Sequence, residues 1–357
     1  MDSLFRKIDW QLIAAVLVLA TAGLLSLLSS SPSMFYKQLL WIGVGALAAC
    51  FFTLVDLRSF FSHKSVIRWL FILMILVLIF AFMFAPKIKG NRSWIVLGSF
   101  QFQPSEFAKI ILIITLSYFF SKAHIGIARW KTIISSFFYF AVLGFLVAAL
   151  PDMGSAFVLL AIWFGYVLVS GMPLKKIIIS AIIFAIAFAL MWVMVLKPYQ
   201  KERVLGMLFP ERDPTGINYH VIQSKIAIGS GGIFGQGFRQ GTQVQLGFLP
   251  EAQTDFIFAA IAEEGGFLAV GVILIAFAWM IFRILKIGSL IDGNFNKFLC
   301  LGAAILFLTQ FAFNVGSNLG LFPVVGVTFP FVSYGGTSML VNMILVGMIQ
   351  SAWIKRS

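Results

Sequence analysis

The chain has 357 residues, of which 61% are hydrophobic and only 11% charged, and its formal net charge is +13. Soluble domains are nearer half apolar and a quarter charged, so this composition excludes an ordinary globular enzyme, a disordered chain and a collagen-like chain. Cys50 and Cys300 are the two cysteines, and two scattered thiols in apolar runs exclude a disulfide scaffold and a zinc site.

Ten apolar stretches have the length of membrane-spanning helices, and they predict an all-α polytopic membrane protein with a single domain over residues 1–357. The first stretch continues through Leu28, which favours an uncleaved helix over a cleavable signal peptide. In chain order the predicted helices are Trp10–Ser29, Leu39–Val55, Ile67–Phe84, Phe107–Phe120, Ile133–Leu150, Ala156–Val169, Ile177–Val195, Asp255–Ile284, Phe298–Phe313 and Phe331–Trp353.

The basic residues predict the orientation of these helices. With the N-terminus inside, 15 of the 26 Lys and Arg residues fall in inner segments, and five fall in the short outer loops and adjoining helix starts. Because Lys and Arg gather in cytoplasmic loops, we expect both termini in the cytoplasm. The charge of +13 is then mainly a topology signal, with attraction to anionic lipids as a side effect, and nucleic acid is not expected as a partner.

Two segments predicted to lie outside are too long and too polar for simple turns, namely residues 85–105 and the large loop of about residues 197–254. In the second, Tyr219, Ile222 and Ile226 recur at helical spacing up to Gly229, which predicts a short helix lying on the surface. The glycine-rich run that follows lacks the spacing of a dinucleotide-binding fingerprint. Its glycines instead favour tight turns against a ligand or the membrane surface.

Acidic residues are scarce, so their placement is informative. Asp255 lies where the large loop gives way to an apolar helix, with Thr254 as the expected N-cap. Either Asp255 only supports the helix start or it has a functional role, and spacing alone leaves both interpretations open. Glu263 and Glu264 lie deeper in the same helix and cannot both share the face of Asp255, so we interpret them as mainly structural.

A second polar group occurs at the outer start of the fourth helix. Glu106 and Lys109 are spaced i, i+3 and can pair, and the lysine meets either Glu106 or a ligand phosphate. Asp152 follows Pro151 at another outer helix boundary, which is typical of a turn or cap. Without a metalloprotease motif, a phosphate loop or a Ser–His–Asp pattern, the candidate groups are outward-facing carboxylates and cations. Such groups suit a substrate whose anionic head emerges from the lipid.

Seven stretches carry specific motifs, in chain order Gln103–Glu106 with Lys109, Pro151–Ala156, Leu249–Phe258, Glu263–Phe267, Asn314, Gly320–Val327 and Pro330–Ser338. They cover essentially the whole chain, and they resemble the SEDS family, which RodA, FtsW and SpoVE typify. Gln240–Gln243, the compact length and the short tails are more similar to the RodA branch. Three positions depart from the usual pattern: Gln253 replaces a His, Leu150 stands where Gln is common, and Ser93 precedes Trp94 where many members have Arg.

The resemblance implies a peptidoglycan glycosyltransferase that polymerises lipid II into β-1,4-linked glycan strands at the outer face of the bacterial plasma membrane. Undecaprenyl pyrophosphate would be released, and the role would be cell elongation and shape maintenance. The family's essential acidic residue corresponds to Asp255, which is then the expected general base. A divalent cation, Mg²⁺ or Mn²⁺, is expected, with Asp255 and Glu106 as possible ligands. The substrate-binding candidates are Lys109, Glu106, Arg92, Arg203, Gln103, Gln223 and Ser224.

The resemblance also implies partners: a class B penicillin-binding protein that supplies the transpeptidase, and elongation components such as MreC and MreD. Three alternatives stay open from the sequence. A many-helix protein with intramembrane charges can be a lipid II flippase, although no inverted repeat of the hydropathy pattern is visible. The chain can also be a division-type member, or a scaffold whose loops only recruit cell-wall synthases.

Overall fold

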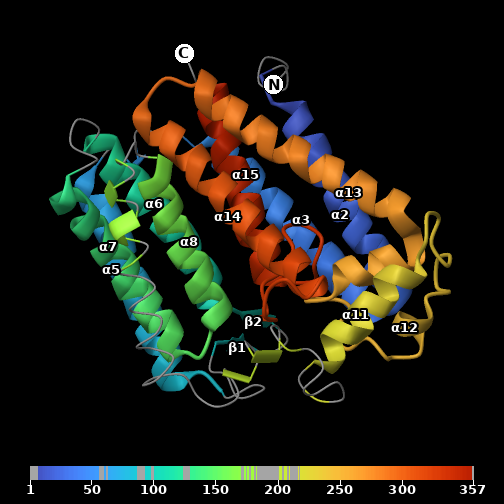
Figure 1. Ribbon diagram of the computed structural model, residues 1–357. Coiled ribbons are helices and arrows are strands. Elements are labelled where there is room, and N and C mark those ends of the chain that lie inside the picture. Colours follow the sequence, from blue (N-terminus) through green and yellow to red (C-terminus); the bar gives the residue numbers. More distant parts are fainter. Residues whose placement is uncertain are drawn as a thin grey trace.

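The structure is a computed structural model, and it describes residues 7–55, 60–61, 63–86, 93–97, 100–123, 129–169, 173, 175–176, 178–180, 182, 201–202, 205–206, 209, 216 and 218–355. These residues form a bundle of long helices with a two-stranded hairpin and two shorter helices at one end (Figure 1). The elements are α2 (Trp10–Ser30), α3 (Pro32–Leu54), α5 (Lys64–Phe84), β1 (Ile95–Leu97), β2 (Phe100–Phe102), α6 (Pro104–Lys122), α7 (Trp130–Ala149), α8 (Met153–Val169), α11 (Tyr219–Ser230), α12 (Thr242–Gln245), α13 (Ile257–Leu290), α14 (Asn294–Asn318) and α15 (Gly336–Ile354).

The predicted all-α polytopic architecture is confirmed. Among the described residues, eight helices are long and apolar enough to cross a membrane, and α8 is a shorter apolar helix. These nine correspond to nine of the ten predicted spans. The remaining one, Ile177–Val195, falls mostly outside the described residues. The predicted surface helix after Tyr219 is also confirmed, as α11.

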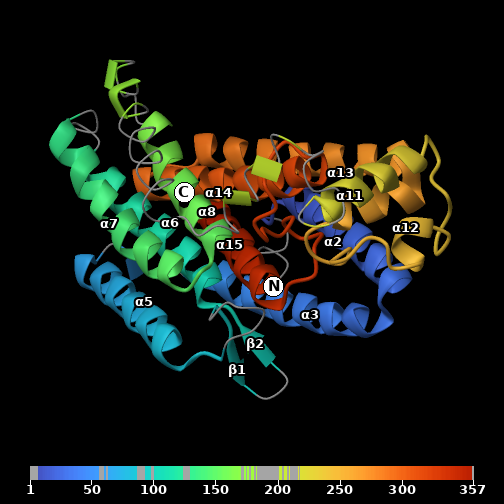
Figure 2. The same ribbon diagram turned by 60° about the horizontal axis from the view of Figure 1, so that its bottom comes forward.

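The helices differ in how much of their surface the bundle covers. Among the described spans, α6 and α15 are the most buried, whereas α3 and α5 leave most of their surface uncovered. Figure 2 shows α3 and α5 on one face of the bundle and α13 and α14 on the opposite face. The strands β1 and β2 pair antiparallel directly before α6, at the end of the bundle that also holds α11 and α12.

The two ends of the described chain meet at the other end of the bundle (Figure 1). Asp9 caps α2 by accepting the N–H of Leu12 at 2.9 Å, and it forms an ion pair with Arg283 of α13. Gln350 of α15 hydrogen-bonds both the backbone N–H and the carbonyl of Asp9, each at 3.0 Å. The first helix is therefore tied into the bundle, and the two ends of the described chain lie at the same end of it.

A break in α13 shapes the opposite end. Gly266 has φ +65°, so α13 loses two of its internal hydrogen bonds there. The loop of residues 231–237 inserts between the separated donors and acceptors and satisfies all four groups. Its hydrogen bonds are Phe267 N–H to Gly232 O at 2.9 Å, Leu268 N–H to Ile233 O at 3.1 Å, Gln236 N–H to Glu263 O at 2.9 Å and Gly237 N–H to Glu264 O at 3.1 Å.

This insertion explains the glycine-rich run. Gly235 has φ +82°, and a Cβ there would lie 2.1 Å from the carbonyl oxygen of Glu264, so only glycine fits. The tight turns predicted from the sequence are present, and they pack against a helix backbone of this same chain. The interpretation of Glu263 and Glu264 as structural also agrees with their contacts. Glu263 accepts the N–H groups of Gln243 and Val244 at the start of α12, and Glu264 accepts from Ser29 and Gln245.

Removing the carboxylate of Asp9 is expected to destabilise the bundle. In Asp9→Ala the N-cap of α2 is lost and the partly buried Arg283 loses its ion-pair partner, so the free energy of unfolding should fall by about 2–3 kcal/mol. Thermal unfolding in detergent measures the change. Asp292→Ala, an exposed carboxylate at the same end of the bundle, is the matched control and should unfold like the unaltered protein. Equal unfolding of Asp9→Ala and Asp292→Ala would contradict this assignment.

Candidate active site

The loop before α13 is anchored by its apolar residues. Leu249, Ala252 and Phe256 are buried against α11 and the first turn of α13. Asp255 lies between these anchors and is half-buried. The alternation of apolar and polar residues therefore fixes the loop on the protein while leaving the carboxylate partly exposed.

Three successive carbonyl groups of this loop accept hydrogen bonds from elsewhere in the chain. The Gln253 carbonyl accepts the N–H of Tyr334 at 2.9 Å, and the Thr254 carbonyl accepts the hydroxyl of Ser333 at 2.6 Å. The Asp255 carbonyl accepts two side-chain amides from α14, those of Asn314 at 3.2 Å and Asn318 at 2.7 Å. The backbone on which Asp255 stands is thus fixed from two sides.

The start of α13 differs from the prediction. The helix begins at Ile257, so Asp255 precedes its first turn, and Thr254 does not cap it. The capping acceptor comes instead from another helix: the side-chain oxygen of Asn318 accepts the N–H of Ala259 at 3.1 Å. The last helix likewise begins at Gly336 rather than Phe331, because the preceding residues hold the Asp255 loop.

The carboxylate of Asp255 faces the segment between α14 and α15. A Cβ at Gly326, which has φ +71°, would lie 4.0 Å from Oδ2 of Asp255, and Gly326 is exposed. Gly326, an exposed glycine without a side chain, therefore lies beside the carboxylate. In the same segment, burial raises the pKa of Tyr334, so its hydroxyl stays neutral near the loop.

Glu106 and Lys109 form a buried ion pair at the start of α6. Lys109 Nζ lies 2.5 Å from Glu106 Oε1, and both side chains are almost fully buried. Glu106 Oε2 has no hydrogen-bond partner among the described residues. Pro104 opens the helix, where its missing N–H is not needed, and Glu106 lies in the first turn, where the helix dipole favours a carboxylate. Of the two interpretations of Lys109, the pairing with Glu106 is the one present in this state.

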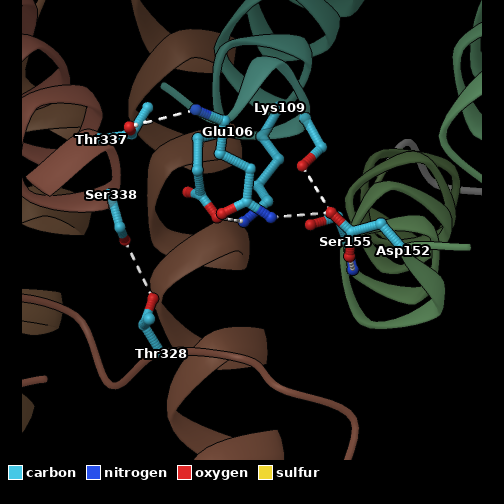
Figure 3. A network of polar contacts seen from close by, with 9 residues as sticks. Glu106, Lys109, Asp152, Ser155, Thr328, Thr337 and Ser338 are labelled. Atoms are coloured by element: carbon cyan, nitrogen blue, oxygen red, sulfur yellow. Dashed lines mark hydrogen bonds and ion pairs between the residues drawn. The ribbon is translucent and has the colours of Figure 1, made fainter. Parts of the chain in front are cut away.

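Asp152 organises a second polar cluster beside this pair (Figure 3). Its Oδ2 accepts the Gln103 amide at 2.8 Å and the Ser105 hydroxyl at 2.6 Å, and its Oδ1 accepts the N–H of Ser155 at 3.1 Å. The predicted turn or cap at Asp152 is confirmed. The same carboxylate also joins the starts of α6 and α8, a role that the sequence analysis missed. Its position after a proline at a helix boundary, in a chain with few acids, was the available signal.

One segment connects the two carboxylate groups. A Cβ at Gly154 would lie 2.3 Å from the carbonyl oxygen of Val325, so α8 packs directly on the residue before Gly326. Further along, Thr328 hydrogen-bonds Ser338 at 2.9 Å, and the hydroxyl of Thr337 accepts the N–H of Gln103 at 3.2 Å (Figure 3). The segment Pro323–Thr328 therefore contacts the start of α8, next to Asp152, at Val325 and lies beside Asp255 at Gly326.

Known proteins with similar sequences identify the family of this chain. The sequence model of the cell cycle protein family, which groups FtsW, RodA and SpoVE, matches residues 4–357. The chain belongs to this family.

Relatives of this SEDS protein include both FtsW and MrdB. It is 33% identical over 359 residues to the probable peptidoglycan glycosyltransferase FtsW of Thiomicrospira cyclica, across 96% of this chain and 91% of that protein. It is 36% identical over 283 residues to the peptidoglycan glycosyltransferase MrdB of Escherichia coli K12, across 79% of this chain and 76% of that protein. Together with its apolar helices, these relatives identify it as a multi-pass bacterial membrane protein.

Solved structures have the same fold. A chain of a peptidoglycan synthase complex that coordinates polymerization and crosslinking superposes with a TM-score of 0.81, at 29% identity and 98% coverage of both chains. The rod shape determining protein RodA of Thermus thermophilus superposes with a TM-score of 0.72, at 26% identity, over 98% of this chain and 97% of that one.

The remaining predicted site residues of this SEDS protein lie in different environments. Ser224 is fully buried and its hydroxyl donates to the Asn318 carbonyl at 2.9 Å, so it joins α11 to α14 and is not open to a sugar or phosphate. Gln223 is half-buried on α11. Arg92 and Arg203 lie outside the described residues.

The two acidic residues predicted as possible ligands of a divalent cation, Asp255 and Glu106, differ in how well they suit that role. No group of three His, Cys, Asp or Glu side chains in the described part of the chain comes together to hold a metal. Glu106 does not fit as a ligand, because the Lys109 ammonium beside it would repel a cation. Asp255, which is half-buried, is the remaining candidate ligand, and a single carboxylate would suffice only for a cation such as Mg²⁺ that keeps most of its ligands from water or phosphate.

The ion pair at the start of α6 predicts a stability pattern for three variants. Lys109→Met leaves Glu106 as a buried, unpaired carboxylate, so it should lower the free energy of unfolding by about 3–5 kcal/mol. The double variant Glu106→Gln with Lys109→Met removes both charges and should recover most of that loss. Thermal unfolding measures both, with Lys122→Met, an exposed lysine at the other end of α6, as the control. A double variant less stable than the single one would contradict the pairing.

Proposed function

We propose that this SEDS protein is a lipid II polymerase in which Asp255 is the general base. The observation that carries the proposal is the arrangement of Asp255, a carboxylate that is partly exposed on a loop whose backbone is held at three successive carbonyls. A catalytic base needs such a fixed support, because proton transfer requires heavy-atom distances of about 2.6–3.2 Å. The family membership and the names of the relatives agree with this chemistry.

In the proposed reaction, Asp255 takes the proton from the 4-hydroxyl of the acceptor sugar. The oxygen then attacks the anomeric carbon of the donor, and the bond from that carbon to the pyrophosphate oxygen breaks. A single displacement inverts the α-linked donor to a β-1,4 linkage and releases undecaprenyl pyrophosphate, with no covalent intermediate on the enzyme. A divalent cation bound with the substrate would supply neutralisation of phosphate charge, with Asp255 as its candidate protein ligand.

The leaving pyrophosphate also requires fixed positive groups and hydrogen-bond donors. We assign this role to Lys109, with Arg92 and Arg203 as further candidates and with Gln103 and Gln223 as polar contacts. Lys109 is buried and paired with Glu106, so its role is to contribute positive charge beneath the site and not to contact the pyrophosphate directly. If this role is correct, the stable double variant Glu106→Gln with Lys109→Met polymerises lipid II poorly although it folds.

The elongation role and the partners are part of the same proposal. The elongation role rests on the structural likeness to RodA of Thermus thermophilus and on the RodA-like stretch Gln240–Gln243, because sequence identity is 36% both to MrdB and to the FtsW of Trichlorobacter lovleyi and does not separate the two branches. The likeness to a chain of a peptidoglycan synthase complex favours a class B penicillin-binding protein as partner. MreC and MreD stay predictions from the resemblance. Restoration of rod shape in cells depleted of RodA, without restoration of division in cells depleted of FtsW, tests the elongation role.

Replacement of Asp255 tests the proposed reaction directly. Asp255→Asn keeps the shape of the side chain but cannot accept the proton, so polymerisation of lipid II should fall by about 100-fold or more. The measurement is glycan length on a gel, with the purified protein and any transpeptidase partner that it needs. Glu251→Gln, an exposed carboxylate in the same loop, is the control and should stay active. Normal polymerisation by a folded Asp255→Asn variant would exclude the general-base role, and transport without glycan product would favour a flippase.

A further inference from the structure

The outer end of α14 presents two asparagines to the same peptide carbonyl. Asn314 and Asn318 lie one helical turn apart, and both donate to the Asp255 carbonyl oxygen, at 3.2 Å and 2.7 Å. A carbonyl oxygen has two lone pairs, so these two donors use its full accepting capacity. The peptide group between Asp255 and Phe256 is therefore held in two directions, which fixes where the Asp255 side chain leaves the backbone.

Each asparagine also holds a second part of the site. The Asn314 amide donates to the Val327 carbonyl at 2.9 Å, one residue beyond Gly326, which faces the Asp255 carboxylate. The Asn318 side-chain oxygen caps α13 through the N–H of Ala259. Both asparagines are almost fully buried, so neither is open to a substrate.

We infer that Asn314 and Asn318 are positioning residues for Asp255: they hold the loop so that the carboxylate stands at a fixed place beside Gly326. Their action passes through the backbone and does not touch the sugar or the pyrophosphate. The inference rests on the proposed function and deepens it, because it names the residues that give the base its geometry. A base displaced by about 1 Å loses a large part of its rate.

The two roles of Asn318 can be separated by one substitution. Asn318→Asp keeps an oxygen that accepts the N–H of Ala259, and a carboxylate at a helix N-terminus is favoured by the helix dipole. It removes the N–H that donates to the Asp255 carbonyl. Because position 318 is fully buried and the lost N–H also donates to the Asn314 carbonyl, Asn318→Asp should unfold at a lower temperature than the unaltered protein, so its activity is compared below its own unfolding temperature. If positioning is the role, its kcat for lipid II polymerisation falls by about 10- to 100-fold, while its KM is unchanged.

Two further variants keep the test decisive. Asn314→Ala leaves the cap of α13 intact and removes one of the two donors, so it should also lower kcat without changing KM, by less than Asn318→Asp does. Asn296→Asp, another buried asparagine at the opposite end of the same helix, is the matched control and should keep the kcat of the unaltered protein. If Asn318→Asp does not fold, the decision passes to Asn314→Ala.

The outcomes separate the two proposals. If the unaltered protein is active and a folded Asn318→Asp or Asn314→Ala variant has a normal kcat, the positioning role is overturned. Asp255 then remains the proposed base. A raised KM with unchanged kcat also overturns the positioning role, because that result indicates a substrate contact. An inactive unaltered protein, assayed with its transpeptidase partner, overturns the proposed function, and the positioning role with it.

Discussion

The candidate site depends on one constraint, the fixing of the loop before α13 by groups that lie far along the chain. The carbonyls of Gln253, Thr254 and Asp255 are held by the last turns of α14 and by the segment that leads to α15. In a chain this apolar, a backbone carbonyl near the membrane has few other partners, and leaving it unpaired would cost several kcal/mol. The same hydrogen bonds that satisfy the carbonyl groups of the loop therefore also fix the orientation of Asp255, which is partly exposed.

At the same end of the bundle, other stretches of irregular backbone are also stabilised by hydrogen bonds from distant parts of the chain. The break at Gly266 is repaired by residues 231–237, and the start of α12 is capped by Glu263. Asp152 joins the starts of α6 and α8, next to the ion pair of Glu106 and Lys109. The described charged groups inside the bundle thus occur in sets that contact one another, although Glu106 Oε2 has no hydrogen-bond partner, and the half-buried Asp255 lies beside the exposed Gly326.

Apolar length and local spacing were enough to predict most of the fold. Nine of the ten predicted spans correspond to described helices, and the short helix from Tyr219 was found from its periodicity. The details that depend on contacts distant in sequence could not be predicted. Thr254 was the expected cap of α13, but Asn318, 64 residues later, supplies the acceptor. Ser224 resembled a polar contact for substrate, yet its partner is the carbonyl of Asn318. Asn314 and Asn318, spaced i, i+4 at the end of an apolar helix, were the visible signal that this end of α14 binds the Asp255 loop.

A structure of this protein with bound lipid II and an acceptor glycan would test the account most directly. In that complex the loop should keep its contacts with Asn314 and Asn318, and the Asp255 carboxylate should lie about 3 Å from the acceptor 4-hydroxyl. The donor pyrophosphate should lie on the side of Gly326 that faces Gln103 and Asp152. A bound acceptor whose 4-hydroxyl is remote from Asp255, with the loop in the same place, would contradict the assignment of Asp255 as the base.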